Sequence, residues 1–136
     1  MQTKETQFLR NVLRLDALTC LTTGVLSVAA SSALGGSFGL STGLLQGSGV
    51  ALLLVGAFIL FAARNVPALR WPVWIVVLGN AGWVLASVLL LISGIERPTG
   101  VGTAYVIGQA VIVAVLAELE YVGLRKTAGV APIVAG

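Results

Sequence analysis

The chain has 136 residues, of which 57% are hydrophobic and 10% are charged, and its formal net charge is +3. A soluble domain carries about 25% charged residues, so this composition is typical of a protein embedded in lipid. The chain has no histidine, one cysteine and one methionine, which excludes an intramolecular disulfide and the usual Cys/His metal centres. The eight basic residues are scattered between apolar runs, so we expect no nucleic-acid partner.

Four apolar runs dominate the chain. A helix needs about 20 mainly apolar residues to cross the hydrocarbon core of a membrane. The runs cover residues 15–34, 44–63, 72–93 and 101–123. We therefore predict an all-α, polytopic membrane protein in which residues 1–136 form a single domain. Its four transmembrane helices are expected to form an up-down bundle.

A short amphipathic segment, residues 2–14, precedes the first predicted span. Phe8, Leu9 and Val12 can share one face of a helix while the charged side chains stay in water. We expect this segment to lie at the membrane interface before the chain turns inward. The connection at residues 35–43 is short, uncharged and rich in glycine and serine, so the first two spans are expected to be antiparallel neighbours.

The basic residues predict the orientation of the spans. Cytoplasmic loops of membrane proteins carry an excess of Lys and Arg. One side of the predicted bundle holds Lys4, Arg10, Arg14, Arg64, Arg70, Arg125 and Lys126. The opposite side holds Arg97. We therefore expect both termini to be cytoplasmic in a bacterial inner (plasma) membrane, with Trp71 and Trp74 anchoring the third span at the headgroup level.

Glycines recur within the spans. Helices in lipid pack closely where small residues let their backbones approach. Gly43 and Gly47 form a GxxxG pair at the start of the second span, and Gly49 and Gly56 follow one heptad apart. We interpret them as ordinary packing within one bundle, with a homodimer face or a hinge as the alternative.

Asp16 begins a stripe of small polar residues on the first span. The stripe continues at helical spacing through Cys20, Thr23, Ser27 and Ser31, so it is expected to face the bundle interior. One hypothesis makes Asp16 a proton- or cation-coupling carboxylate. The interpretation we favour from sequence is an ion pair with an arginine at the cytoplasmic interface, within a layer that ties the first and fourth spans together. The candidate arginines are Arg14, Arg64 and Arg125.

Four more polar residues lie inside the spans. Glu118 and Glu120 are two positions apart, which is about 200° of rotation on a helix, so one is expected to point inward and the other outward. Asn80 and Gln109 lie deep in the third and fourth spans, where an amide needs a hydrogen-bonding partner. We expect these amides to join helices, with binding of a quinone or lipid carbonyl as the alternative.

The third and fourth spans also carry a resemblance to known proteins. The stretches WPVWIVVLGNAGWVLASVLLL and GTAYVIGQAVIVAVLAELEYVGLRK are similar to those of small bacterial inner-membrane proteins with four helices and no assigned activity. The hydropathy pattern of the whole chain resembles the DoxX-like group of four-helix membrane proteins. This resemblance implies a four-helix bundle in the membrane, and it implies no site residues.

The sequence favours a function without chemistry of its own. We expect no enzymatic activity, no catalytic residue, no metal and no cofactor. The first hypothesis is a structural or accessory membrane protein, either a homo-oligomer or a small subunit of a larger complex. The second is an oligomeric transporter or channel with Asp16, Asn80, Gln109 and a glutamate along its path. The third is a binder of a lipophilic molecule, such as a quinone, carotenoid or lipid, between the helices.

Overall fold

The computed structural model describes residues 3–128, and within this range the chain is helical, with no strand. Its five helices are α1 (Lys4–Ala29), α2 (Ser31–Phe38), α3 (Thr42–Asn65), α4 (Trp71–Ser93) and α5 (Gly100–Ala128). All except the short α2 are long and apolar enough to span a membrane. The described part of the chain therefore has the architecture of a multi-pass membrane protein.

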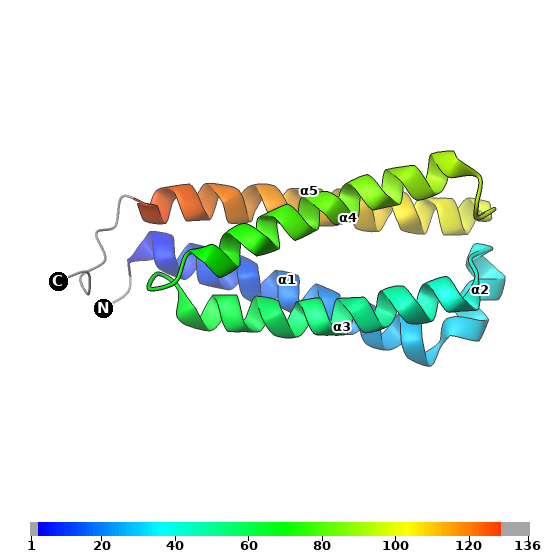
Figure 1. Cartoon of the computed structure of the whole chain (residues 1–136), viewed down its shortest axis with the longest axis horizontal. Coiled ribbons are helices and arrows are strands. Elements are labelled where there is room, and N and C mark those ends of the chain that lie inside the picture. Colours follow the sequence, from blue (N-terminus) through cyan, green and yellow to red (C-terminus); the bar gives the residue numbers. More distant parts are fainter. Residues whose placement is uncertain (1–2, 129–136) are drawn as a thin grey trace.

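The long helices are arranged as two pairs. Figure 1 shows α1 beside α3 and α4 beside α5, with α2 at one end of the bundle. At the opposite end lie the start of α1, the end of α3, the start of α4 and the end of α5. Six of the eight basic residues belong to these segments, and Arg70 directly precedes α4 at the same end. We call this the basic end, and the opposite end the α2 end.

Local sequence signals explain where the helices begin and end. The hydroxyls of Thr3 and Ser41 accept hydrogen bonds from backbone N–H groups in the first turns of α1 and α3, which satisfies donors that a helix leaves unpaired. Pro72 lies in the first turn of α4, where its missing N–H costs little. Gly39 and Gly94 follow α2 and α4 with φ of 68° and 74°, a left-handed conformation that favours glycine.

The structure differs from the sequence prediction on either side of the first span. Residues 4–14 are not a separate interfacial element, because α1 continues through them without a break. Gln2 lies outside the described residues. The predicted span 15–34 is interrupted at Ala30, after which α2 begins. Hydropathy does not detect this break, because the residues that follow Ala30 are uncharged and Ala33 and Leu34 continue the apolar run.

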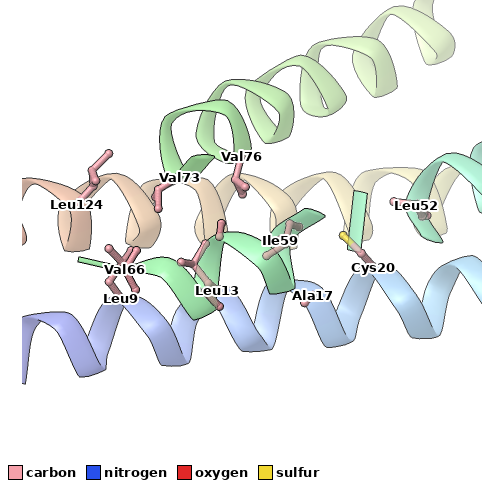
Figure 2. Packing of buried hydrophobic residues seen from close by; sticks show 12 residues of the cluster. Leu9, Leu13, Ala17, Cys20, Leu52, Ile59, Val66, Val73, Val76 and Leu124 are labelled. Carbon is pink, nitrogen blue, oxygen red and sulfur yellow. The ribbon is translucent and has the colours of Figure 1, made fainter. Parts of the chain in front are cut away.

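Two hydrophobic clusters hold the pairs together. The larger cluster lies toward the basic end and combines side chains from all four long helices, among them Leu13, Ile59, Val73 and Leu124 (Figure 2). The smaller one lies at the α2 end and is built on Leu40 and two further buried residues. The bundle is therefore packed from apolar side chains near both ends.

The pair α1–α3 packs backbone against backbone. A Cβ placed on Gly49 would lie 2.9 Å from the carbonyl oxygen of Gly24, and a Cβ on Gly24 would lie 2.8 Å from the carbonyl oxygen of Gly49. A Cβ on Gly56 would meet Leu21 at 2.8 Å. In contrast, a Cβ on Gly43 or Gly47, the GxxxG pair, would meet no atom of another helix within 4 Å. The predicted close packing is confirmed for Gly49 and Gly56 and is wrong for the GxxxG pair.

Two arginines at the basic end bind helix carbonyls. Arg10 Nε donates to the Ala63 carbonyl at the end of α3 at 2.9 Å. Arg70 reaches the end of α5, where it donates to the Leu124 carbonyl and the Thr127 hydroxyl, each at 3.0 Å. The last carbonyls of a helix lack intrahelical partners and carry partial negative charge. These arginines therefore join neighbouring helices at this end.

The other predicted interface residues lie on the outside of the basic end. Trp71 and Trp74 at the start of α4 are exposed. Trp71 lies near Phe58 and Phe61, and Trp74 packs edge-on against Tyr121. Arg14, Arg64, Arg125 and Lys126 are exposed as well. Their anchoring role in lipid stays a prediction.

Candidate functional site: a carboxyl–amide cluster beside a cavity

Three polar side chains from three helices meet inside the bundle. The side-chain amide nitrogen of Asn80 on α4 donates to Asp16 Oδ2 on α1 at 2.7 Å and to Glu120 Oε1 on α5 at 2.8 Å. Asp16 and Glu120 are fully buried, and Asn80 is 5% exposed. We call Asp16, Asn80 and Glu120 the carboxyl–amide cluster. It links the two helix pairs, because α1 belongs to one pair and α4 and α5 to the other.

Helical geometry explains why these residues point inward. Asp16 shares a face of α1 with the buried residues Cys20 and Ser27, as the small polar stripe predicts. Glu120 is buried while Glu118 is exposed, which agrees with their rotation of about 200° around α5. The prediction that one glutamate faces inward is confirmed, and the structure identifies it as Glu120.

The hydrogen-bond donors of the cluster do not satisfy all of its oxygens. Both bonds from the Asn80 amide nitrogen go to carboxyl groups. The thiol of Cys20 lies 3.6 Å from Asp16 Oδ1 and is placed to donate to it. Glu120 Oε2 is buried without a hydrogen-bonding partner in the described part of the chain. A buried oxygen without a donor is costly, so the cluster is short of positive charge or of protons.

The predicted ion-pair layer is absent from residues 3–128. Asp16 bonds to an amide and a thiol rather than to an arginine. Arg14 lies two positions from Asp16 and therefore on the opposite side of α1, where it is exposed. Arg64 and Arg125 are exposed as well. The ion-pair interpretation is wrong because these arginines lie on outward faces while the acidic groups point into the bundle.

Gln109 belongs to a separate network. Its side-chain oxygen accepts from the indole nitrogen of Trp83 at 2.7 Å, and its nitrogen donates to the Ser87 hydroxyl at 2.9 Å. The expectation that Gln109 joins helices is confirmed, because Trp83 and Ser87 lie on α4. The role of Trp83 is not predicted from sequence, although its spacing of four residues from Ser87 places both on one face.

A cavity of about 680 Å³ lies between the two helix pairs and touches both networks. Asp16, Cys20 and Asn80 lie at one part of its wall, and Trp83 and Gln109 at another. Most of the remaining wall is apolar. Its rim includes exposed large apolar side chains, and these are Leu54, Val55, Ile75 and Ile112. The cavity therefore reaches the outer surface of the helices that are apolar enough to span a membrane.

Small residues explain why the middle of the bundle is hollow. Gly79 and Gly108 line the cavity, and a Cβ on either would have no neighbour within 4 Å. A second cavity of about 230 Å³ lies toward the α2 end and shares Leu52, Trp83, Tyr105 and Gln109 with the first. The packing that fills both ends of the bundle is therefore interrupted between the two hydrophobic clusters.

The chemistry available at this site is that of binding and proton holding. Within residues 3–128, no group of three or more His, Cys, Asp or Glu side chains could hold a metal ion. The site offers carboxyl groups, amides, an indole N–H and apolar walls. Pockets of about 300–1,000 Å³ with apolar walls and a few convergent polar groups are typical of small-molecule sites.

Comparisons with protein-family models, with curated proteins and with solved structures found no match to this chain. The DoxX-like resemblance therefore stays a prediction.

Proposed function

We propose that this chain is a membrane protein that binds a lipophilic small molecule in the cavity between its two helix pairs. The observation that carries the proposal is the cavity of about 680 Å³, which has apolar walls, exposed apolar rim residues and polar groups at its wall. A structural bundle has no need of such a space, because empty volume forfeits packing energy. A ligand that partitions into lipid could enter directly from the bilayer.

The proposal includes a placement in the membrane. Four helices cross the inner (plasma) membrane of a bacterial cell up and down, with the basic end and both termini on the cytoplasmic side. The support is the distribution of seven basic residues at one end against Arg97 at the other. Exposed Trp71 and Trp74 at the basic end suit the headgroup region.

Replacing Gly108 by leucine tests the proposal. The new side chain has open space around its Cβ and extends into the cavity, so it should occupy the ligand site without straining the fold. Binding of the neutral lipophile N-phenyl-1-naphthylamine, measured by its fluorescence with the full chain in lipid nanodiscs, is expected to weaken by about tenfold or more.

Gly82→Leu is the matched control. Gly82 has equally open surroundings but does not line the cavity, so this variant should bind the probe as the native chain does. The proposal is wrong if the native chain shows no saturable binding, or if Gly108→Leu binds as tightly as the native chain. Mass spectrometry after extraction in mild detergent should also reveal a co-purifying lipophile.

Two other functions remain predictions. A transporter is favoured by the buried carboxyl groups beside the cavity, because a carrier needs a group that exchanges protons or cations for its substrate. The same ligand binding would be its first step. An accessory role in a larger complex predicts a partner protein in stoichiometric amount, which the detergent extraction would also reveal.

A further inference from the structure

We propose that the ligand of the cavity is a lipophilic cation, which replaces a proton held by the carboxyl groups of Asp16 and Glu120. This inference rests on the proposed function and adds the chemical class of the ligand. It is carried by an acidic pair that contacts no basic side chain within residues 3–128: Asp16 lines the apolar cavity with its aromatic walls, and Glu120 is joined to Asp16 through Asn80.

The two carboxyl groups are close enough to influence each other. Asp16 Oδ2 and Glu120 Oε1 contact the same nitrogen atom of Asn80. Two carboxyl groups therefore lie within the range of about 4–6 Å in which like charges disfavour each other. Since Glu120 Oε2 also lacks a donor, two unprotonated groups here would be both repelled and incompletely bonded. We therefore expect the empty site to hold at least one proton.

Within residues 3–128, no basic side chain bonds to this pair. Lys and Arg are absent from the cavity wall, and the hydrogen bonds of Asp16 and Glu120 come from Asn80 and Cys20. A carboxylate without a counter-ion inside a membrane is costly. A proton or a cation from outside the chain can remove that cost. The proton and the cation would each neutralise the same carboxylate, so binding of the cation should release the proton.

The cavity wall suits a lipophilic cation in two further respects. Phe58, Trp83 and Tyr105 contribute aromatic rings from three helices, and aromatic faces attract cations. The rim residues Leu54 and Ile112 are apolar, so a bare inorganic ion would find no replacement for its water there. A cation with apolar substituents matches both the walls and the carboxyl groups.

The exchange replaces one proton of a carboxyl group by one cation, so the charge of the site is conserved. As the cation enters, one carboxyl group loses its proton to the surrounding water, and no bond to the ligand forms. Cys20 of α1 lies beside the pair, Tyr105 of α5 lines the cavity farther toward the α2 end, and α3 and α4 contribute no titratable group to the cavity wall. Binding of a permanently charged cation should therefore strengthen as the pH rises, because fewer protons compete for the carboxyl groups.

Tetraphenylphosphonium and neutral tetraphenylsilane form a matched pair of probes for this inference. They share their shape and differ by one charge. With the full chain in nanodiscs, we expect the cation to bind about tenfold or more tightly than the silane, since a charge within several ångströms of a carboxylate is attracted strongly in a low dielectric. A pH indicator should register release of one proton for each cation bound.

The double variant Asp16→Asn with Glu120→Gln should remove this preference. It keeps the size of both side chains but not their charge, so silane binding should persist and report an intact cavity. Glu118→Gln, which changes an exposed glutamate of the same helix, should leave both affinities unchanged.

Three results would overturn the inference, and one would overturn the proposed function beneath it. Equal binding of cation and silane by the native chain shows that the cavity takes lipophiles without regard to charge. A preference that survives in the double variant shows that the cation binds elsewhere. Binding of the cation without proton release or pH dependence excludes the exchange. If the native chain binds neither of these probes nor N-phenyl-1-naphthylamine, the cavity is not a ligand site and both proposals fail.

Discussion

Replacing Asn80 by leucine is expected to lower the free energy of unfolding by about 2–3 kcal/mol. Asn80 supplies a hydrogen bond to each of two fully buried carboxyl groups on other helices. Leucine has a similar size and cannot donate, so both carboxyl groups lose a donor while the helix packing is kept. Reversible unfolding in mixed detergent and sodium dodecyl sulfate would measure the change.

This expected cost exceeds that of an ordinary hydrogen bond between membrane helices, which averages about 0.6 kcal/mol. The difference arises because the Asn80 amide donates to both carboxyl groups, and the other donor to the pair is the weak Cys20 thiol. Gln109→Leu is the matched control, since it removes another amide between helices whose side-chain partners are an indole and a hydroxyl. If Asn80→Leu costs no more than Gln109→Leu, the cluster has no special part in stability.

A third variant distinguishes the loss of the Asn80 hydrogen bonds from the cost of leaving two buried carboxyl groups without a donor. Replacing Asp16, Asn80 and Glu120 together by leucine removes the polar groups as well as their bonds. Apolar replacement of a complete buried polar set is often neutral or stabilising. The triple variant should therefore unfold within about 1 kcal/mol of the native chain, although its cation binding should be lost.

Gly49→Leu is expected to be destabilising by about 3 kcal/mol or more, the upper range for overpacking. Any side chain at Gly49 meets the backbone oxygen of Gly24 and the side chains of Val28 and Ser27 at 3.0 Å or less. A backbone oxygen within a helix cannot move aside, so α1 and α3 must separate. The same unfolding measurement would show the loss.

Gly47→Leu provides the comparison on the same helix. Nothing lies within 4 Å of a Cβ at Gly47, and leucine has a better helix propensity than glycine by nearly 1 kcal/mol. This variant should therefore be neutral or slightly more stable. A loss at Gly47 similar to that at Gly49 would mean that both glycines form close contacts, contrary to the structure.

The main features of the fold could be predicted from the sequence because lipid imposes a simple rule on length and polarity. Three of the four predicted apolar runs lie within α3, α4 and α5, and the first is divided between α1 and α2; on α1, Asp16, Cys20 and Ser27 of the polar stripe are buried, as their spacing predicts. The helices extend beyond the runs, from Lys4 in α1 and to Ala128 in α5. Hydropathy indicates how long the apolar part of each helix is, whereas the helical hydrogen bonds continue into the polar residues at its ends.

The residues of the candidate site could be predicted from the sequence, but the contacts between them could not. Asp16, Asn80 and Glu120 stand out because polar groups are rare within the spans, but their meeting depends on how three helices are rotated and crossed. The mistaken pairing of Asp16 with arginine follows from considering depth without rotation. The cavity depends on where side chains are missing, and glycines such as Gly49 and Gly108 look alike in sequence while one is packed and the other is open.

Photolabelling tests most directly whether the cavity holds a lipophilic molecule. The full chain in nanodiscs would be irradiated with a diazirine derivative of tetraphenylphosphonium, and the labelled residues would be mapped by mass spectrometry. We expect labels at cavity residues such as Phe58 and Ile112. Unlabelled tetraphenylphosphonium should compete with the labelling, and the labels should be lost in Gly108→Leu. Labels spread over outward-facing residues such as Leu85 and Ile92, unaffected by competitor or variant, would contradict it.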